Sequence, residues 1–297
     1  SKGKQVKVIT TRIQGSDRSA YRVSFSDGSY IDADAEHEWN VFCDREVYRG
    51  WKAGDRKSVR RPEILETQNL LLKQRRPPAL PIIESLLNRP IEAPIDPYVL
   101  GVWLGDGNSD APYITCAYND TQIIDEIQQT GLSVSEVRSS NINSGRFKFS
   151  NNEGLLENRV STKLKRLGVL NNKHIPEIYL LGSVEQRLAL LQGLMDTDGY
   201  VDIKGRCEFT NTNKQLAYGV HNLLSTLGIK NSVCEGIARL NGKDCGPKYR
   251  IMFSSHLPCF RLVRKLKRLN TNISKRARTK YIIGVTPIEP MPRKCIQ

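Results

Sequence analysis

The chain has 297 residues, a formal net charge of +14 and a pI near 9.5. Such a basic chain points to a polyanionic partner, above all nucleic acid. The sequence contains neither a long apolar run nor a charged-then-apolar leader, so we expect no membrane partner and a cytoplasmic, intracellular location. Seven cysteines without a C-x-x-C pair predict reduced thiols rather than a zinc site.

Short alternating or apolar runs predict strands in residues 1 to about 60, at 6–9, 21–25, 30–31 and 39–42. A cationic stretch follows, and we interpret it as a loop that tracks phosphates, with a solvated loop as the alternative. Its candidate DNA contacts are Arg49, Lys52, Arg60 and Arg61. Residues 63–73 predict a helix, and the proline-rich stretch 77–97 predicts a linker rather than a packed element.

From residue 97 onward, helices alternate with short strands, and the order of elements occurs twice. The first half predicts a helix ending at Asp106, then strand 113–118, helix 122–129, strands 133–138 and 146–150, and helix 155–167. The second half predicts a helix ending at Asp198, then strand 206–210, helix 215–227, strands 231–237 and 249–253, and helix 257–269. Internal duplication predicts a pseudo-twofold α+β fold.

The two helices that open these halves carry matching motifs at 100–107 and 190–199, each closed by Asp-Gly. Small residues four apart let two such helices pack closely; they are Gly101 and Gly105 in the first helix and Gly193 and Thr197 in the second. Close packing would bring Asp106 and Asp198 together at the negative ends of two helix dipoles. That arrangement favours a divalent cation with oxygen ligands, most simply Mg²⁺, with Mn²⁺ or Ca²⁺ able to substitute. The alternative is turn chemistry alone, as at Asp27-Gly28.

The paired motifs in αββαββα repeats resemble the LAGLIDADG homing endonucleases over about residues 95–283. The resemblance implies a monomer, without a small-molecule cofactor, that makes a metal-dependent double-strand break in DNA, one strand per aspartate. Because the two halves differ in sequence, we expect a long and only partly palindromic site. The implied domains are a β domain of residues 1–90 with 281–297, a first repeat at 91–180 and a second at 181–280.

The flanks resemble intein splicing (Hint) domains. Residues 21–41, which include His37, resemble the block whose histidine activates the first peptide bond, and residues 67–70 and 281–297 resemble later strands. The match lacks a nucleophile-bearing block before Val6 and a final His-Asn pair, so we expect no splicing and a structural role for His37. The two segments would form one discontinuous β domain.

Lysines at equivalent repeat positions are the candidates for polarising water or phosphate. Segments 163–173 and 265–275 match with an offset of 275 − 173 = 102, whereas the aspartates are 198 − 106 = 92 apart. We therefore place about ten extra residues in a loop at 240–247 and select Lys173 and Lys275. A solvated lysine is the alternative, and Arg276 and Lys280 compete for the role.

Further candidates surround the two acids and the strands. Gln192 and the backbone carbonyls of Gly105 and Thr197 are expected to orient metal or water. The strands should read bases in the major groove, with the candidates Arg138, Arg146, Lys148, Lys204, Arg206, Arg239 and Arg250, and with Asn211 and Asn213 for adenine. Candidate phosphate contacts are Lys163, Lys165, Lys265 and Lys267. Each of these charges could instead be simply solvated.

A non-cleaving DNA-binding regulator or an RNA maturase on the same scaffold is the main alternative function. Both acids and both repeat lysines are present, and a protein that only binds nucleic acid needs neither. The sequence therefore favours the endonuclease.

Overall fold

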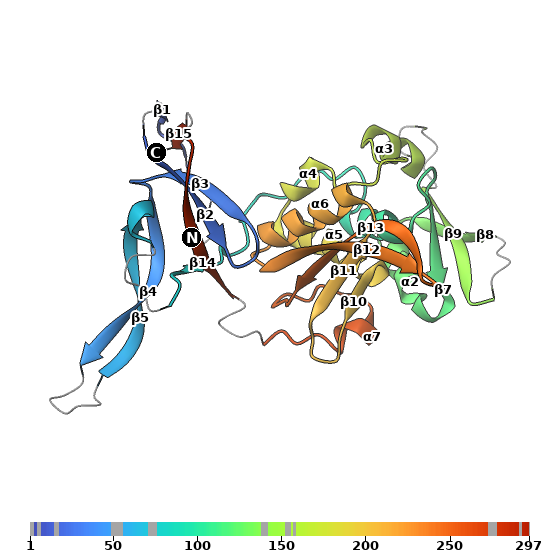
Figure 1. The fold of residues 1–297 in the computed structure, drawn as a ribbon. Coiled ribbons are helices and arrows are strands. Elements are labelled where there is room, and N and C mark those ends of the chain that lie inside the picture. The colour runs from blue at the N-terminus through green and yellow to red at the C-terminus, as the bar shows by residue number, and fades with distance from the viewer. Residues whose placement is uncertain are drawn as a thin grey trace. The chain divides into compact units, whose positions relative to one another are not determined.

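The computed structural model describes residues 3–4, 7–14, 18–48, 56–70, 76–137, 142–151, 156, 159–272, 278–290 and 293–296. The chain forms two compact units (Figure 1). We call Ser1–Lys4 with Glu84–Ile273 the helical unit, and Gln5–Ile83 with Ser274–Gln297 the β unit. In the described part of the chain, no helix is both long and apolar enough to cross a bilayer.

The β unit combines strands from both ends of the chain. Its strands are β1 (Thr11–Gln14), β2 (Ala20–Phe25), β3 (Tyr30–Asp34), β4 (Glu38–Tyr48), β5 (Arg56–Glu66), β6 (Ala79–Pro81), β14 (Thr279–Ile288) and β15 (Arg293–Ile296). The main sheet has the order β3-β2-β14-β6-β4-β5, and β1 pairs with β15. The predicted helix at 63–73 is wrong in its described part. Residues up to Glu66 pair with β4, which turns Leu65 toward the core of this unit, and a single 3₁₀ turn follows.

His37 has a structural place in the β unit. Its ring packs edge-on against Trp39 with the ring centroids 5.0 Å apart. The Trp39 indole N–H donates to Thr67 Oγ1 at 2.9 Å, and the Thr67 hydroxyl lies 3.3 Å from the His37 carbonyl oxygen that it can donate to. These contacts connect β4 with the turn after β5.

The two halves of the helical unit share the predicted order of helix, strand, helix, two strands and helix, with an additional helix at the end of the first half and an additional strand after the first helix of the second. The first half contains α1 (Pro97–Asp106), β7 (Tyr113–Ala117), α2 (Gln122–Gln128), β8 (Ser133–Val137), β9 (Ser144–Ser150), α3 (Val160–Arg166) and α4 (Glu177–Leu180). The second half contains α5 (Val184–Thr197), β10 (Gly199–Val201), β11 (Cys207–Asn211), α6 (Lys214–Thr226), β12 (Asn231–Leu240), β13 (Lys243–Phe253) and α7 (Val263–Leu266). The sheets have the orders β7-β9-β8 and β10-β11-β13-β12.

The predicted helix at 257–269 is wrong outside α7, which covers only Val263–Leu266. Pro258 lies in the irregular chain before α7 and lacks an N–H for a helix interior. The N–H groups of Arg261 and Leu262 donate to the buried Asp196 carboxylate instead of to a preceding turn.

The predicted loop at 240–247 is part of a long hairpin. Strands β12 and β13 pair as far as Leu240 and Lys243, and Asn241 and Gly242 make the turn with positive φ angles of 50° and 81°. The segment therefore belongs to two paired strands and the turn between them.

The second half of the predicted linker is packed against the helical unit. The Ser85 hydroxyl donates to the Leu227 carbonyl at 2.8 Å, and the Leu86 N–H donates to the Thr226 carbonyl at 2.9 Å. The fully buried Arg187 donates to the carbonyls of both Leu86 and Thr226. One buried guanidinium thus joins α5, the end of α6 and the linker.

Helices α1 and α5 form the centre of the helical unit. Every residue of α1 from Pro97 to Leu104 is buried. A Cβ added to Gly101 would lie 3.1 Å from Gly193 Cα and overlap the Leu190 carbonyl, and a Cβ on Gly193 would lie 2.7 Å from the Val102 nitrogen. The two backbones are therefore in direct contact, which only glycine permits here.

We predict that Gly193→Ala lowers the free energy of unfolding of the helical unit by at least about 1–3 kcal/mol, because the added methyl must push α1 away from α5. Urea unfolding with a helix-sensitive probe measures the effect. Gly236→Ala is the matched control, because a Cβ there makes only ordinary contacts with Lys248. Equal stabilities of the two variants would contradict the direct backbone contact.

Candidate functional site

The two motif aspartates lie at adjoining helix ends. Asp106 is the last residue of α1, and Asp198 follows the last residue of α5. A Cβ on Gly105 would lie 3.6 Å from the Asp198 nitrogen and would overlap the Thr197 side chain. The packing of the helices thus places both acids at one end of the pair.

Both carboxylates are harder to ionise than usual. Loss of hydration, followed by the charge of Asp198, raises the pKa of Asp106 to about 6, although its side chain remains open to solvent. Burial also raises the pKa of Asp198, while a hydrogen bond from Asn211 opposes the shift. An added cation would relieve this repulsion.

Lys173 provides a positive charge at the end of α1. Its ammonium group donates to the carbonyls of Gly105 and Gly107 at 3.0 and 2.7 Å, and lies 5.3 Å from the centre of the Trp103 ring. Burial lowers the pKa of Lys173, and the charges of Asp198 and Asp106 oppose that shift. The Gly105 carbonyl, expected to orient metal or water, accepts from this lysine.

Lys265 takes the corresponding place at the end of α5. Its ammonium group donates to the carbonyls of Met195, Asp196 and Gly199 at 2.9, 2.7 and 2.7 Å, and to that of Thr197 at 3.3 Å. Only 6% of Lys265 is exposed, and burial lowers its pKa to about 8. The expectation of a surface phosphate contact at Lys265 is therefore corrected, and the Thr197 carbonyl also accepts from a lysine.

The two site lysines keep the spacing of the acids. Lys173 and Lys265 are 265 − 173 = 92 residues apart, the same as Asp106 and Asp198. The similar sequences of segments 163–173 and 265–275 suggested an offset ten residues larger, and so pointed to Lys275. That residue lies outside the described residues.

Asp196 is a site residue that sequence reasoning missed. Its carboxylate accepts the N–H groups of Arg261 and Leu262 at 3.1 Å and the Tyr98 hydroxyl at 3.0 Å. It is 2% exposed, and burial raises its pKa to about 6. Residues two apart on a helix point in different directions. From the Asp-x-Asp spacing one could therefore have predicted that Asp196 points into the protein and Asp198 lies at the helix end.

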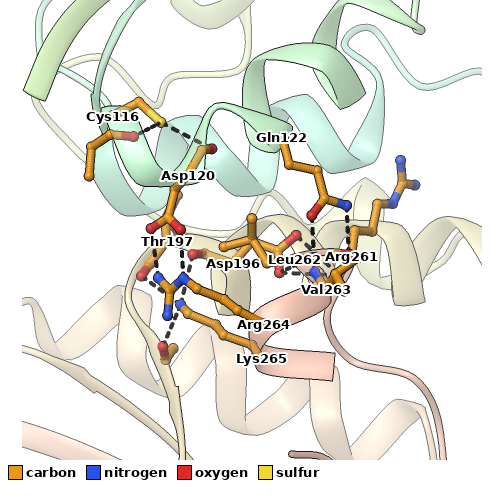
Figure 2. A network of polar contacts seen from close by, with 12 residues as sticks. Cys116, Asp120, Gln122, Asp196, Thr197, Arg261, Leu262, Val263, Arg264 and Lys265 are labelled. Atoms are coloured by element: carbon orange, nitrogen blue, oxygen red, sulfur yellow. Dashed lines mark hydrogen bonds and ion pairs between the residues drawn. The ribbon is translucent and has the colours of Figure 1, made fainter. Parts of the chain in front are cut away.

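Gln192 contacts Arg261, a member of the network of polar contacts that Figure 2 shows, and makes no contact with Asp106 or Asp198 among the described residues. The Gln192 carbonyl oxygen accepts from Arg261 at 3.0 Å, and its amide donates to the Pro258 carbonyl at 2.6 Å. In Figure 2, Gln122 reaches the same segment from α2, donating to the Arg261 carbonyl and accepting from the Val263 N–H. The proposed role of Gln192 in orienting metal or water is corrected accordingly.

Asn211 and Asn213 also contact the site rather than facing outward as adenine readers. Asn211 Nδ2 donates to Asp198 Oδ2 at 3.0 Å. Asn213 accepts the Leu216 N–H as the N-cap of α6, and its amide donates to the Lys173 carbonyl at 2.7 Å. Both side chains are committed within the protein.

The strand cations occupy an exposed sheet surface. Arg146 and Lys148 are exposed on β9 and alternate with buried Phe147 and Phe149, so they lie on one face. The remaining described strand and hairpin candidates are also exposed: Lys204, Arg206, Arg239 and Arg250. Arg206 and Arg250 have acidic neighbours, Asp202 at 3.8 Å and Glu208 at 3.7 Å. Arg138 lies outside the described residues.

The other cationic candidates are divided. Lys165, Lys267 and Arg61 are exposed. Lys163 lines a cavity of about 700 Å³ with Asp96 and Pro97, at the opposite end of α1 from Asp106. Arg60 donates to Asp44 at 3.1 Å and to the Pro77 carbonyl, which is an internal contact of the β unit. Arg49 and Lys52 lie outside the described residues.

The donor set suits a hard divalent cation. Among the described residues, no cluster of three or more His, Cys, Asp or Glu side chains is arranged to hold a metal. Asp106 and Asp198 would therefore hold the ion with water completing its shell, as Mg²⁺ commonly requires. Their raised pKa values favour the binding of positive charge.

Several solved structures and one curated protein resemble the chain. Mesophilic variants of the homing endonuclease I-DmoI are 16% identical, and the match covers 61% of this chain and 98% of that one with a TM-score of 0.37. I-DmoI in complex with DNA and Mn is 17% identical over 55% of this chain and 90% of that one, again with a TM-score of 0.37. The replicative DNA helicase DnaB of Mycobacterium intracellulare is 32% identical over 99% of this chain and 50% of the relative, so the chain spans about half of its length. Residues 185–260, which include Asp198, match the family model of the LAGLIDADG-like domain.

Proposed function

We propose that the protein is an intein-derived homing endonuclease that makes a metal-dependent double-strand break in a long, partly palindromic DNA site. The observation that carries the proposal is the pair of carboxylates on adjoining helix ends, each end with a lysine whose ammonium group donates to its carbonyls. The match of residues 185–260 to a LAGLIDADG-like domain supports it.

Each residue of the site has a part in this proposal. A divalent ion, when bound, lowers the pKa of coordinated water and neutralises charge on a phosphodiester. Asp106 and Asp198 would bind the divalent ion at the scissile phosphates, one aspartate per strand. Lys173 and Lys265 stabilise the two helix ends by donating to their carbonyls. Among the exposed cations, Arg146 and Lys148 on β9 are proposed to contact the duplex.

The β unit is proposed to be a remnant of an intein splicing domain. The pairing of β14 with β2 joins the two ends of the chain in one sheet, as an insertion of the helical unit into a β domain requires. The match to half of a longer helicase chain supports an origin as an insert within such a host.

A non-cleaving regulator or an RNA maturase remains the competing function. Either would need the exposed cations but not two solvent-accessible acids of raised pKa. Selection of cleaved sequences from a randomised plasmid library with Mg²⁺ separates the functions. Recovery of linear molecules with a shared long site supports the endonuclease, and recovery of none with retained DNA binding supports the regulator.

We predict that Asp198→Asn abolishes double-strand cleavage of the selected site and leaves binding in Ca²⁺ within about threefold, because the change removes charge but little volume. Gel analysis of plasmid products and a binding titration measure the two effects. Asp110→Asn, at an exposed acid outside the pair, is the control and should cut normally. A linear product from Asp198→Asn would refute the assigned role.

We predict that Ca²⁺ affinity falls as the pH drops through about 6, the pKa of Asp106, because a proton competes with the ion there. Below that value the apparent dissociation constant should rise about tenfold per pH unit for each proton displaced. Calorimetric titration between pH 5 and pH 8 measures the effect. Asp106→Asn should flatten the dependence, and a flat wild-type profile would contradict the assignment.

We predict that DNA affinity falls roughly 10³-fold between about 50 and about 200 mM salt, as expected for about six or more phosphate contacts. Fluorescence anisotropy with a labelled site measures the slope. Arg146→Gln should reduce the slope by about one unit if this side chain contacts a phosphate. Salt-independent binding would count against DNA as the partner.

A further inference from the structure

Asn211 is fixed on both sides of its amide. Its Oδ1 accepts the Asn213 N–H at 2.9 Å, and its Nδ2 donates to Asp198 Oδ2 at 3.0 Å. A backbone N–H can only donate, so the orientation of the Asn211 amide is settled. The side chain lies on the same side of β11 as buried Phe209, facing the helices. Asn211 thus connects the start of α6 to one of the two acids.

The first half lacks the matching contact. The offset of 92 residues that separates the two acids and the two site lysines pairs Asn211 with Asn119, and in the described part of the chain no hydrogen bond joins Asn119 to Asp106. Asn213 and Asp120 each contact the segment of a site lysine. Asp120 does so through Arg264, with two hydrogen bonds of 2.6 Å. The Tyr118 hydroxyl donates to Glu136 at 2.6 Å.

The two acids are consequently held to different degrees. One oxygen of Asp198 is fixed by Asn211, which leaves the other for a ligand. Within the described ranges, no side chain donates a hydrogen bond to Asp106, which is the more exposed of the two. A carboxylate already held in one rotamer loses less freedom when it binds an ion.

We propose that Asn211 is a positioning residue that pre-orders Asp198, so that the two halves of the site are unequal and the two DNA strands are cut at different rates. The inference rests on the proposed endonuclease function and specifies the order in which the two DNA strands are cut. The strand served by Asp198 is cut first, and a nicked duplex accumulates before the second cut.

The first test follows each strand separately. Single-turnover rates are measured on a selected duplex with the two strands carrying different labels. Asn211→Ala should slow one strand by about 10- to 100-fold, the usual effect of removing a residue that orients a ligand, and the other by less than about threefold. Tyr118→Phe, which removes a hydroxyl that donates to Glu136 and to neither acid, should leave both rates unchanged. Equal slowing of both strands would show a merely structural role and overturn the proposal.

The second test requires no cleavage. Tb³⁺ alone is titrated into the full chain, with luminescence sensitised by Trp103, whose ring packs beside the end of α1. Asn211→Ala should weaken Tb³⁺ binding about tenfold, and Tyr118→Phe should not. Unchanged affinity, or no Tb³⁺ binding by the wild type, would overturn the role of Asn211. Weakened Tb³⁺ binding in a chain that cuts no selected DNA would uphold that role and refute the endonuclease.

Asn211→Ser separates the loss of the Asp198 contact from a folding defect. The serine hydroxyl can still accept the Asn213 N–H, which preserves the turn before α6, but it is too short to reach Asp198. The serine variant should therefore keep the wild-type melting temperature and reproduce the strand-selective loss. A serine variant with wild-type Tb³⁺ affinity and wild-type rates would contradict the proposal.

Discussion

The direct backbone contact between α1 and α5 is the constraint on which the site depends. With glycine at 101 and 193, the helices approach until main-chain atoms touch, and their C-terminal ends come to adjoin. Unpaired carbonyls and two carboxylates then gather in one place, which is unfavourable without positive charge. Lys173 and Lys265 supply part of the positive charge that this arrangement needs, because their ammonium groups donate to the carbonyls. The carboxylates remain, and burial raises the pKa of both.

The α5 motif contains two acids with opposite tasks. Asp196 is sealed from solvent and takes its hydrogen bonds from Tyr98 and from the main chain before α7, so it fastens that segment to the helix pair. Asp198, two residues later, is partly exposed and holds one hydrogen bond from Asn211. The first acid therefore gives the site its shape, and the second supplies its charge.

The sequence was informative where the pattern was local. The repeated order of elements, the two helices and the acids at their ends follow from periodicity, small residues and Asp-Gly. Lys265, Gln192 and Asn211 were misassigned because their partners are backbone or carboxylate groups distant in the chain. Similarity between two lysine-rich segments pointed to Lys275, which lies outside the described residues, and so passed over Lys265. Residues 63–66 have helix-compatible composition, but pairing with β4 decided their structure.

The two halves of the helical unit complete each other. Lys173 belongs to the first half, yet its carbonyl is held by Asn213 from the second. Lys265 belongs to the second half, and its neighbour Arg264 is held by Asp120 from the first. The segment that carries each site lysine is thus hydrogen-bonded to a residue of the other half. Separation of the halves would remove the supports of both lysines at once, so the acid pair and its charges are properties of the duplicated fold and not of either half.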